Sequence, residues 1–329
     1  MNPFEELCPA PPTWRVRWDD IGAALDRARA GPAPAAPAEL AELAGLDEWR
    51  ARPAAERARL FAAALLLGES RRAEFFARRV LWELGVPVAW REHVVALVRH
   101  HRLPADLLEH PDPDRAVFRV SLLARNDDLA LLATATGADA TLFREYAAEL
   151  GCLDTPRRFP SDHARFLYFR TPGRDPDYAA YDNTRFAVTI MSGLPGAGKD
   201  TWIAANRAGA PVVSLDALRE ELGVSPAGDQ GPVVAAAVAR AKVLLRAGTP
   251  FVWNATNVSR QLRSRCVGLV ADYGARVEVV SVEAPPELLR RRNRARPHPV
   301  PDSVITRMAG RWEPPDLTEA HAVTYVRND

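Results

Sequence analysis

The sequence predicts an all-α N-terminal domain followed by an α/β domain built on a parallel sheet. In the first half, apolar residues recur throughout at helical spacing. From Arg185 onward, short β-rich runs alternate with helical stretches, a pattern typical of parallel strands with helices on both faces of the sheet. The chain has 329 residues, more than the size at which one hydrophobic core keeps growing, so two domains are expected.

The N-terminal domain, residues 1–153, is predicted from its helical patterns. The spacing is clearest at Phe76, Val80 and Leu84 and again at Val94, Leu97, Val98 and His101. Gly85 and Pro87 lie between the two helices, and proline ends a helix because it lacks the backbone N–H. Further helices are expected over residues 116–132 and 141–150.

Residues 154–184 are predicted to be a linker, because prolines and a glycine there alternate with aromatic residues that would anchor it. The α/β domain then covers residues 185–329. Its strands are expected at residues 186–191, 211–215, 250–253 and 277–282, with a long helix from Val233 to Arg246.

Composition narrows the class of protein. Hydrophobic residues make up 47% of the chain and charged residues 26%, as in soluble globular proteins, which excludes a disordered or fibrous chain. The longest apolar run, Leu60 to Leu67, is far shorter than the roughly 20 residues that cross a bilayer, and the N-terminus has no basic region before an apolar core. With three scattered cysteines as well, we expect a cytoplasmic protein with no membrane partner.

A phosphate-binding loop follows the first predicted strand and precedes a helix. It reads Gly193-Leu194-Pro195-Gly196-Ala197-Gly198-Lys199-Asp200-Thr201. Its glycines allow backbone N–H groups to wrap a phosphate, the helix N-terminus adds positive potential, and Lys199 reaches the β- and γ-phosphate oxygens. The motif predicts ATP bound by Gly193, Pro195, Gly196, Ala197, Gly198, Lys199, Asp200 and Thr201, with Lys199 also catalytic.

The magnesium ligands of this loop are unusual. Asp200 stands where a serine or threonine normally ligates Mg²⁺, and Thr201 is adjacent, so either residue is a candidate ligand. The third strand ends without an acidic residue, which removes the usual second carboxylate and leaves Thr256 and Asn257 as polar groups there. Asp200 would compensate for that loss.

Asp216 is the candidate general base. It lies at the end of the second predicted strand, and ligands bind at the carboxyl edge of open α/β sheets. Arg219 shares a helical face with it and would hold a phosphate or orient the carboxylate. The alternative is that Asp216 only caps the helix that follows, a position where aspartate is favoured.

Arginines are concentrated late in the chain. Residues 251–311 hold eleven arginines against five acidic residues, which favours an anionic partner over a random scatter of charge. The run from Arg290 to Arg296 has the composition of a lid whose arginines neutralise charge on a transferred phosphoryl group. Arg290 and Arg291 are expected on a solvated helix face.

Together these motifs resemble the 5′-hydroxyl polynucleotide kinase branch of the P-loop phosphotransferases, over about residues 186–329. The matching positions are Lys199, the Asp216/Arg219 pair, Thr256 and Asn257, the lid residues Arg292, Asn293 and Arg296, and Val300-Pro301. The resemblance implies that Asp216 is the base on the 5′-hydroxyl, that Arg292 is a catalytic lid arginine and that Arg296 contacts ATP. It also implies acceptor contacts from Arg219, Thr256 and Asn257. Arg260 is added to these because it follows Thr256-Asn257.

The N-terminal domain resembles the HD-phosphohydrolase module that is fused to such kinases in bacterial end-healing proteins. The similar stretches are residues 78–82 and 97–104. The metal-binding motif is missing, because the first histidine is His93, no His-Asp pair occurs, and Gly68-Glu69-Ser70 stands where the metal-binding turn would lie. We therefore expect a degenerate, catalytically silent module that holds no metal and is retained for binding RNA ends or a partner.

The leading hypothesis is an enzyme that transfers the γ-phosphate of ATP, with Mg²⁺, to the 5′-hydroxyl end of RNA or DNA in nucleic-acid repair, with a ligase as a candidate partner. One alternative is a P-loop kinase of a small metabolite, antibiotic or nucleotide-sugar, because such enzymes share the loop, the base and the lid. The other is an ATP-gated binding module without catalysis, which the missing third-strand carboxylate would fit.

Overall fold

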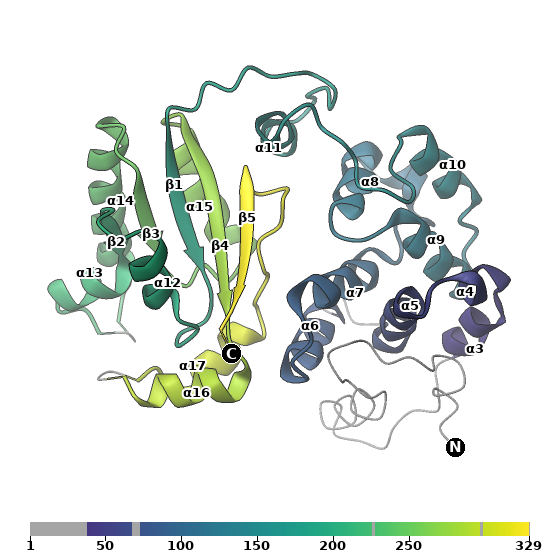
Figure 1. The fold of residues 1–329 in the computed structure, drawn as a ribbon, viewed down its shortest axis with the longest axis horizontal. Coiled ribbons are helices and arrows are strands. Elements are labelled where there is room, and N and C mark those ends of the chain that lie inside the picture. The colour runs from purple at the N-terminus through teal and green to yellow at the C-terminus, as the bar shows by residue number, and fades with distance from the viewer. Residues whose placement is uncertain (1–37, 68–72, 226–227, 297–298, 329) are drawn as a thin grey trace. The chain divides into compact units, whose positions relative to one another are not determined.

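A computed structural model describes residues 38–67, 73–225, 228–296 and 299–328. The chain forms two compact units, Met1–Arg158 and Phe159–Asp329, and the predicted order of a helical region before an α/β region is confirmed (Figure 1). Within the described ranges, no helix is long and apolar enough to cross a membrane.

The described part of the first unit is helical. Its elements are α3 (Ala38–Gly45), α4 (Asp47–Ala51), α5 (Ala54–Leu66), α6 (Ala73–Glu83), α7 (Val88–His100), the 3₁₀ turn η1 (Leu107–Glu109), α8 (Pro113–Ser121), α9 (Asn126–Ala135) and α10 (Thr141–Glu149). Gly85 takes a positive φ of 75° and Pro87 precedes α7, so the break between α6 and α7 lies where the sequence predicts it.

One expected helix is two helices. The pattern over residues 116–132 is divided between α8 and α9, with Asn126 at the start of α9. The Asn126 side chain is buried and donates to the carbonyls of Val117 (3.2 Å) and Cys152 (2.7 Å). These bonds tie the start of α9 to two other segments, a long-range role that helical periodicity does not reveal.

The second unit alternates strands and helices. In chain order it contains α11 (Asp162–Arg170), β1 (Phe186–Ser192), α12 (Lys199–Asn206), β2 (Val212–Ser214), α13 (Leu215–Glu221), α14 (Gly231–Arg246), β3 (Phe251–Asn254), α15 (Arg260–Ala271), β4 (Ala275–Glu283), α16 (Pro286–Arg294), α17 (Asp302–Ala309) and β5 (Ala322–Arg327). Helix α11 lies inside the segment 154–184 that was predicted as a linker, and it packs on the second unit through Phe166, whose ring centroid is 4.1 Å from that of His321.

The sheet has five parallel strands in the order β2-β3-β1-β4-β5. The central strand β1 pairs with β3 through Val188 opposite Phe251 and with β4 through Val188 opposite Val277. The edge strand β5 was not predicted. It pairs only with β4 and is largely accessible, so its sequence lacks the continuous apolar run of a central strand.

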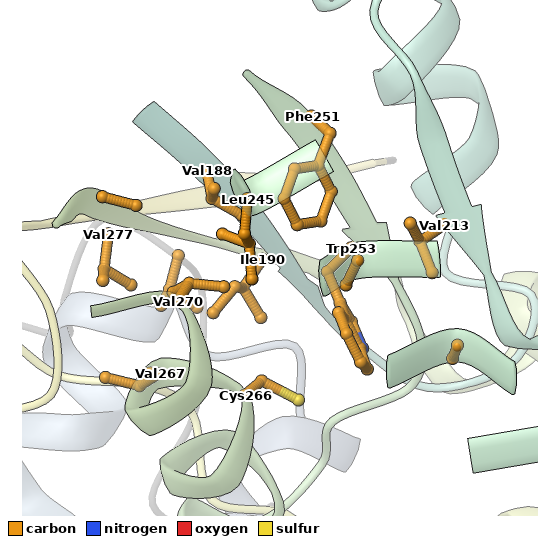
Figure 2. Packing of buried hydrophobic residues seen from close by; sticks show 14 of the residues in the cluster. Val188, Ile190, Val213, Leu245, Phe251, Trp253, Cys266, Val267, Val270 and Val277 are labelled. Carbon is orange, nitrogen blue, oxygen red and sulfur yellow. The ribbon is translucent and has the colours of Figure 1, made fainter. Parts of the chain in front are cut away.

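Alternation along the strands divides the core between the two faces of the sheet. Val188 and Ile190 of β1 pack with α14 and α15, as Figure 2 shows for Leu245, Val267 and Val270. Met191 points the other way and packs with Ile203 of α12. The helices therefore cover both faces, and the carboxyl ends of β1, β2 and β3 meet at one edge.

Candidate functional site

The phosphate-binding loop joins the end of β1 to the start of α12, and its glycines are required by close packing. A Cβ on Gly193 would lie 2.3 Å from the carbonyl oxygen of Val282, and one on Gly196 would lie 2.7 Å from that of Leu289 in α16. Gly198, which caps α12 with φ 101°, would place a Cβ 2.5 Å from Asn328 Nδ2. The loop thus keeps a backbone path that no side chain allows.

Lys199 is folded into this loop. Its Nζ donates to the carbonyl oxygens of Gly193 (2.9 Å) and Leu194 (3.2 Å). Burial lowers the pKa of Lys199 to about 8, although Asp200 and Asp216 oppose the shift. An anion bound in the loop would stabilise the ammonium, so Lys199 is suited to hold a phosphate.

The rest of the loop is supported from the chain's last strand. Asn328 follows β5 and donates from Nδ2 to the carbonyl oxygen of Ala197 (2.7 Å), and its own N–H donates to Glu283 (2.9 Å). Pro195 is buried beside it in the loop. Sequence analysis did not find Asn328, because its partners are more than forty residues away.

Arg292 brings an unpaired donor to the loop. Helix α16 packs on Gly196, and Arg292 Nη1 lies 3.6 Å from the Cβ position of Gly198. That nitrogen is buried and has no hydrogen-bond partner among the described residues. An anion bound in the loop would give this nitrogen an acceptor.

The segment after α16 is tied back to it. Asn293 is buried, donates from Nδ2 to the Val300 carbonyl (2.7 Å) and accepts from the Val300 N–H (3.0 Å). These two bonds give a structural reason why Asn293 and Val300 occur together in the lid motif. Arg290 and Arg291 are exposed, as predicted.

Asp216 does not cap its helix. The cap of α13 is Ser214, whose Oγ accepts from the N–H of Ala217 (3.3 Å). Asp216 instead pairs with Arg219 (2.5 Å) and with Arg296 (3.4 Å), and its side chain remains 60% exposed. Burial opposes ionisation, but Arg219, Arg296 and Lys199 together hold the pKa of Asp216 below its usual range. Asp216 is therefore an accessible, ionised carboxylate at neutral pH. The alternative that it only caps the helix is wrong, because Ser214 is the cap.

Arg219 has a second partner that sequence analysis missed. Its Nε donates to Gln230 Oε1 (2.9 Å), and Gln230 Nε2 donates to the carbonyls of Ser225 (3.0 Å) and Gly228 (2.8 Å). Gln230 precedes α14, so this network links α13 to the start of the neighbouring helix.

Asp200 meets the end of β3. Asn254, the last residue of that strand, donates from Nδ2 to Asp200 Oδ1 (2.7 Å). The pair places a carboxylate from the first turn of α12 beside an amide from the end of β3, whereas the next residue, Thr201, is exposed and no hydrogen bond links its side chain to this pair. A carboxylate and an amide oxygen suit a hard cation such as Mg²⁺, so Asp200 with Asn254 forms the better candidate ligand pair.

Thr256 and Asn257 support the loop. The Thr256 carbonyl accepts from the N–H of Gly193 (2.8 Å). Asn257 is buried, takes a positive φ of 42°, and donates from Nδ2 to the Met191 carbonyl (2.9 Å). The Asn257 side chain thereby links the end of β3 to β1, and its predicted acceptor contact stays a prediction.

Two arginines of the predicted basic surface, Arg260 and Arg263, form ion pairs within the chain. Arg260 pairs with Asp316 (2.9 Å) and donates to Thr318 Oγ1 (2.5 Å). Arg263 is fully buried and makes a two-pronged ion pair with Glu319, at 2.8 Å for each bond. These arginines are neutralised by acidic residues from the segment before β5, which lies outside the span used for the charge count. The Arg260 side chain is partly exposed, at 27%, and its acceptor role stays a prediction.

In the helical unit, the charged groups form an internal cluster. Arg52 pairs with Asp127 (2.9 Å) and Asp128 (3.2 Å), and His93 Nε2 lies 3.0 Å from Asp128 Oδ2. Among the residues described, no three or more His, Cys, Asp or Glu are grouped to hold a metal ion. Gly68-Glu69-Ser70 lies outside the described residues, and the HD-like identity stays a prediction.

Comparison with known proteins gives a match within the second unit. Residues 188–315, less than half of the chain, match the family model described as an AAA domain. No curated protein matches. Among solved structures, the chain is similar to one described as a "putative kinase" from Chloroflexus aurantiacus J-10-fl. The two sequences are 16% identical, the match covers 45% of this chain and 87% of that chain, and the TM-score is 0.36. The loop, the sheet order and the family match together support a P-loop nucleotide-binding fold for this unit.

Proposed function

We propose that the α/β unit transfers the γ-phosphate of ATP to the 5′-hydroxyl end of RNA or DNA. The observation that carries the proposal is the accessible carboxylate of Asp216, paired with Arg219 and Arg296 and electrostatically coupled to Lys199. A base, an acceptor-side arginine and the phosphate-binding loop are the parts that phosphoryl transfer to a hydroxyl requires.

The residues of the loop fit a nucleotide phosphate. Lys199 donates to two loop carbonyls, and Arg292 Nη1 is a buried donor near Gly198 that lacks an acceptor among the described residues. Phosphate oxygens would supply acceptors for both groups. Mg²⁺ would be held by Asp200 and Asn254, and when bound it would neutralise charge on the β- and γ-phosphates.

The proposed reaction is a direct displacement. The acceptor oxygen forms a bond to the γ-phosphorus while the bond to the bridging oxygen breaks and ADP leaves. Asp216 accepts the proton of the acceptor hydroxyl, and Arg219 orients that carboxylate at 2.5 Å. Lys199 and Arg292 stabilise the charge on the transferred group, which costs little reorganisation because both are held in place by the loop and α16.

The acceptor class is supported by the lid, where Arg290, Arg291 and Arg294 are exposed. The product, a 5′-phosphate end, is the substrate of a ligase, which makes a ligase the proposed partner. A specific observation favours a second candidate, the kinase of a small metabolite, antibiotic or nucleotide-sugar. Arg263 is buried and Arg260 is paired with Asp316, so the positive surface for a long polyanion is smaller than the sequence implies.

The decisive experiment compares acceptors of equal chemistry and different length. Transfer of labelled γ-phosphate would be measured with a 5′-hydroxyl oligonucleotide, the matching nucleoside, and the same oligonucleotide carrying a 5′-phosphate as the control. We expect kcat/KM for the oligonucleotide to exceed that for the nucleoside by orders of magnitude and to fall with salt, because neutralised phosphates release counterions. Equal efficiency on both acceptors would support the small-molecule kinase. ATP binding without transfer to any acceptor would support the ATP-gated binding module.

A further inference from the structure

The side chain of Gln230 occupies a junction between α13, which carries the candidate base, and the start of α14. Its Oε1 accepts from Arg219 Nε (2.9 Å). Its Nε2 donates to the carbonyl oxygens of Ser225 (3.0 Å) and Gly228 (2.8 Å). The amide therefore uses its acceptor oxygen and both of its donor hydrogens within this network.

These bonds fix the direction in which the amide faces. Turning it by 180° would place Nε2 against the Nε–H of Arg219, donor against donor, and Oε1 against two carbonyl oxygens. The Gly228 N–H also donates to the Ser225 carbonyl (2.9 Å), which keeps those two acceptors in one turn. Gln230 is thus a fixed acceptor for Arg219.

With Nε held by Gln230, the rest of the Arg219 guanidinium is directed at Asp216. Its Nη1 donates to Asp216 Oδ1 (2.5 Å), and the Arg219 side chain is only 24% exposed. A guanidinium is planar and its N–H groups have a fixed geometry, so bonds from Nε and Nη1 to two different partners set both its plane and its rotation.

The two oxygens of Asp216 differ as a result. Oδ1 is held by Arg219 at 2.5 Å, whereas Oδ2 is approached by Arg296 Nη2 at 3.4 Å, a length at which a hydrogen bond is weak. The Asp216 side chain is also 60% exposed. Oδ1 therefore anchors the carboxylate, and Oδ2 is the oxygen that is suited to accept a proton.

We propose that Gln230 is a positioning residue for phosphoryl transfer, which holds Arg219 so that Asp216 presents Oδ2 to the acceptor hydroxyl. The effect on transfer rests on the proposed function, whereas the anchoring of Arg219 does not. Gln230 acts through Arg219 and not on the reacting atoms. Its loss should therefore lower kcat and leave ATP binding by the Lys199 loop unchanged, because orientation of the base matters in the transition state.

A second polar link between the same two helices provides a matched control. Arg240 of α14 donates to both carboxylate oxygens of Glu221, the last residue of α13, at 2.6 and 2.7 Å. This pair joins α13 to α14 without involving Arg219 or Asp216. Glu221→Gln weakens that link, while Gln230→Met removes all three amide bonds with little change in side-chain length.

The first test measures transfer of labelled γ-phosphate to a 5′-hydroxyl oligonucleotide by the full chain. We expect Gln230→Met to lower kcat about tenfold with KM for ATP unchanged, and Glu221→Gln to behave like the wild type. In an Arg219→Ala background, Gln230→Met should cause no further loss, because it acts through Arg219. A further loss in the double variant would overturn the proposal, as would a wild-type kcat in Gln230→Met or an equal loss in Glu221→Gln.

The second test needs no acceptor and separates this proposal from the proposed function. Nitrogen-15 relaxation of the Arg219 Nε–H, assigned with Arg219→Lys, should show an ordered group in the wild type and Glu221→Gln and a mobile one in Gln230→Met. An equally ordered Arg219 in all three proteins would overturn the proposal even where transfer occurs. If Arg219 becomes mobile but the wild type transfers phosphate to no acceptor, the anchoring by Gln230 stands and the proposed function fails.

A further variant guards against a change in folding. Gln230→Ala removes the same three bonds without adding a long apolar side chain, so it should have the same effects as Gln230→Met on kcat and on the mobility of Arg219. Thermal unfolding checks that each variant remains folded. Wild-type kcat and an ordered Arg219 in folded Gln230→Ala would overturn the proposal.

Discussion

Arg52 in the helical unit and Arg292 in the α/β unit are both arginines with little access to solvent, but their surroundings differ. Arg52 is surrounded by carboxylates, and Asp127 beside it has a pKa below its usual range because Arg125 and Arg52 outweigh the effect of burial. Arg292 keeps a buried Nη1 with no partner among the described residues, next to the phosphate-binding loop. The comparison teaches that the completeness of the pairing, more than burial, distinguishes an arginine that stabilises the fold from one that awaits a ligand.

The largest expected effect is on the α/β side of this comparison. Lys199→Ala removes an ammonium that donates to two loop carbonyls, so it should leave the fold intact while transfer falls by about 10³-fold. Single-turnover transfer of labelled γ-phosphate measures the loss, with thermal unfolding as the control. Transfer within a few-fold of wild type would show that Lys199 is a structural part of the loop.

The matching change in the helical unit should act on stability. Arg52→Met leaves Asp127 and Asp128 buried with fewer partners, so we expect a loss of about 3 kcal/mol, while ATP binding is retained. Denaturant unfolding of the full chain measures it. Arg50→Met, which removes an exposed pair, is the control and should change stability by less than about 1 kcal/mol. If Arg52→Met unfolds at the same denaturant concentration as the wild type, the paired carboxylates around Arg52 do not stabilise the fold, and the contrast with Arg292 fails.

Asp216→Asn tests the base. The change preserves size but removes the proton acceptor, so transfer should fall by roughly 10²-fold or more while ATP still binds. Ser214→Ala is the matched control, because it removes the true cap of α13 and should cost about 1 kcal/mol of stability with little effect on transfer. If both variants lose transfer equally, the geometry of α13 matters and the carboxylate does not.

The Asp200 and Asn254 pair permits an exchange experiment. Asp200→Ser should weaken Mg²⁺ binding by about 10–100-fold, because the only carboxylate of the pair is lost. The double variant Asp200→Ser with Asn254→Asp returns a hydroxyl to the loop and a carboxylate to the strand and should recover most of the affinity. Calorimetric titration of Mg²⁺ in the presence of ADP measures both. No recovery in the double variant would mean that Asp200 acts alone.

The smallest effect concerns pH. The pKa of Lys199 is about 8 in the folded protein against an ordinary 10.5, so its ammonium is lost as the pH rises through 8, and ATP affinity should fall several-fold by pH 9. Between about pH 8 and 10.5 the unfolded chain binds the extra proton, so stability should rise with pH there. Lys199→Arg keeps its charge and should abolish both trends. A wild-type ATP affinity that is constant to pH 9 would contradict the shift.

Much of the α/β unit could be predicted from sequence because its signals are local. The strand β1, the glycine loop and helix α12 are contiguous, so spacing alone places Lys199 at the helix start. The same holds for Asp216, which follows β2 in the first turn of α13. In the helical unit, spacing located α6 and α7 but merged α8 with α9, since the division depends on bonds from Asn126 to residues far along the chain.

The sequence by itself determined the order of the two units, the loop and the placement of Lys199 and Asp216, because helix and strand periods and glycine conformations are set by neighbouring residues. Only the tertiary structure decided which charges remain available. It buried Arg263 against Glu319, brought Asn254 to Asp200 and left Arg292 Nη1 beside the loop. The physical reason is that the pairing and solvation of a charge depend on segments tens of residues away, and no local pattern records them.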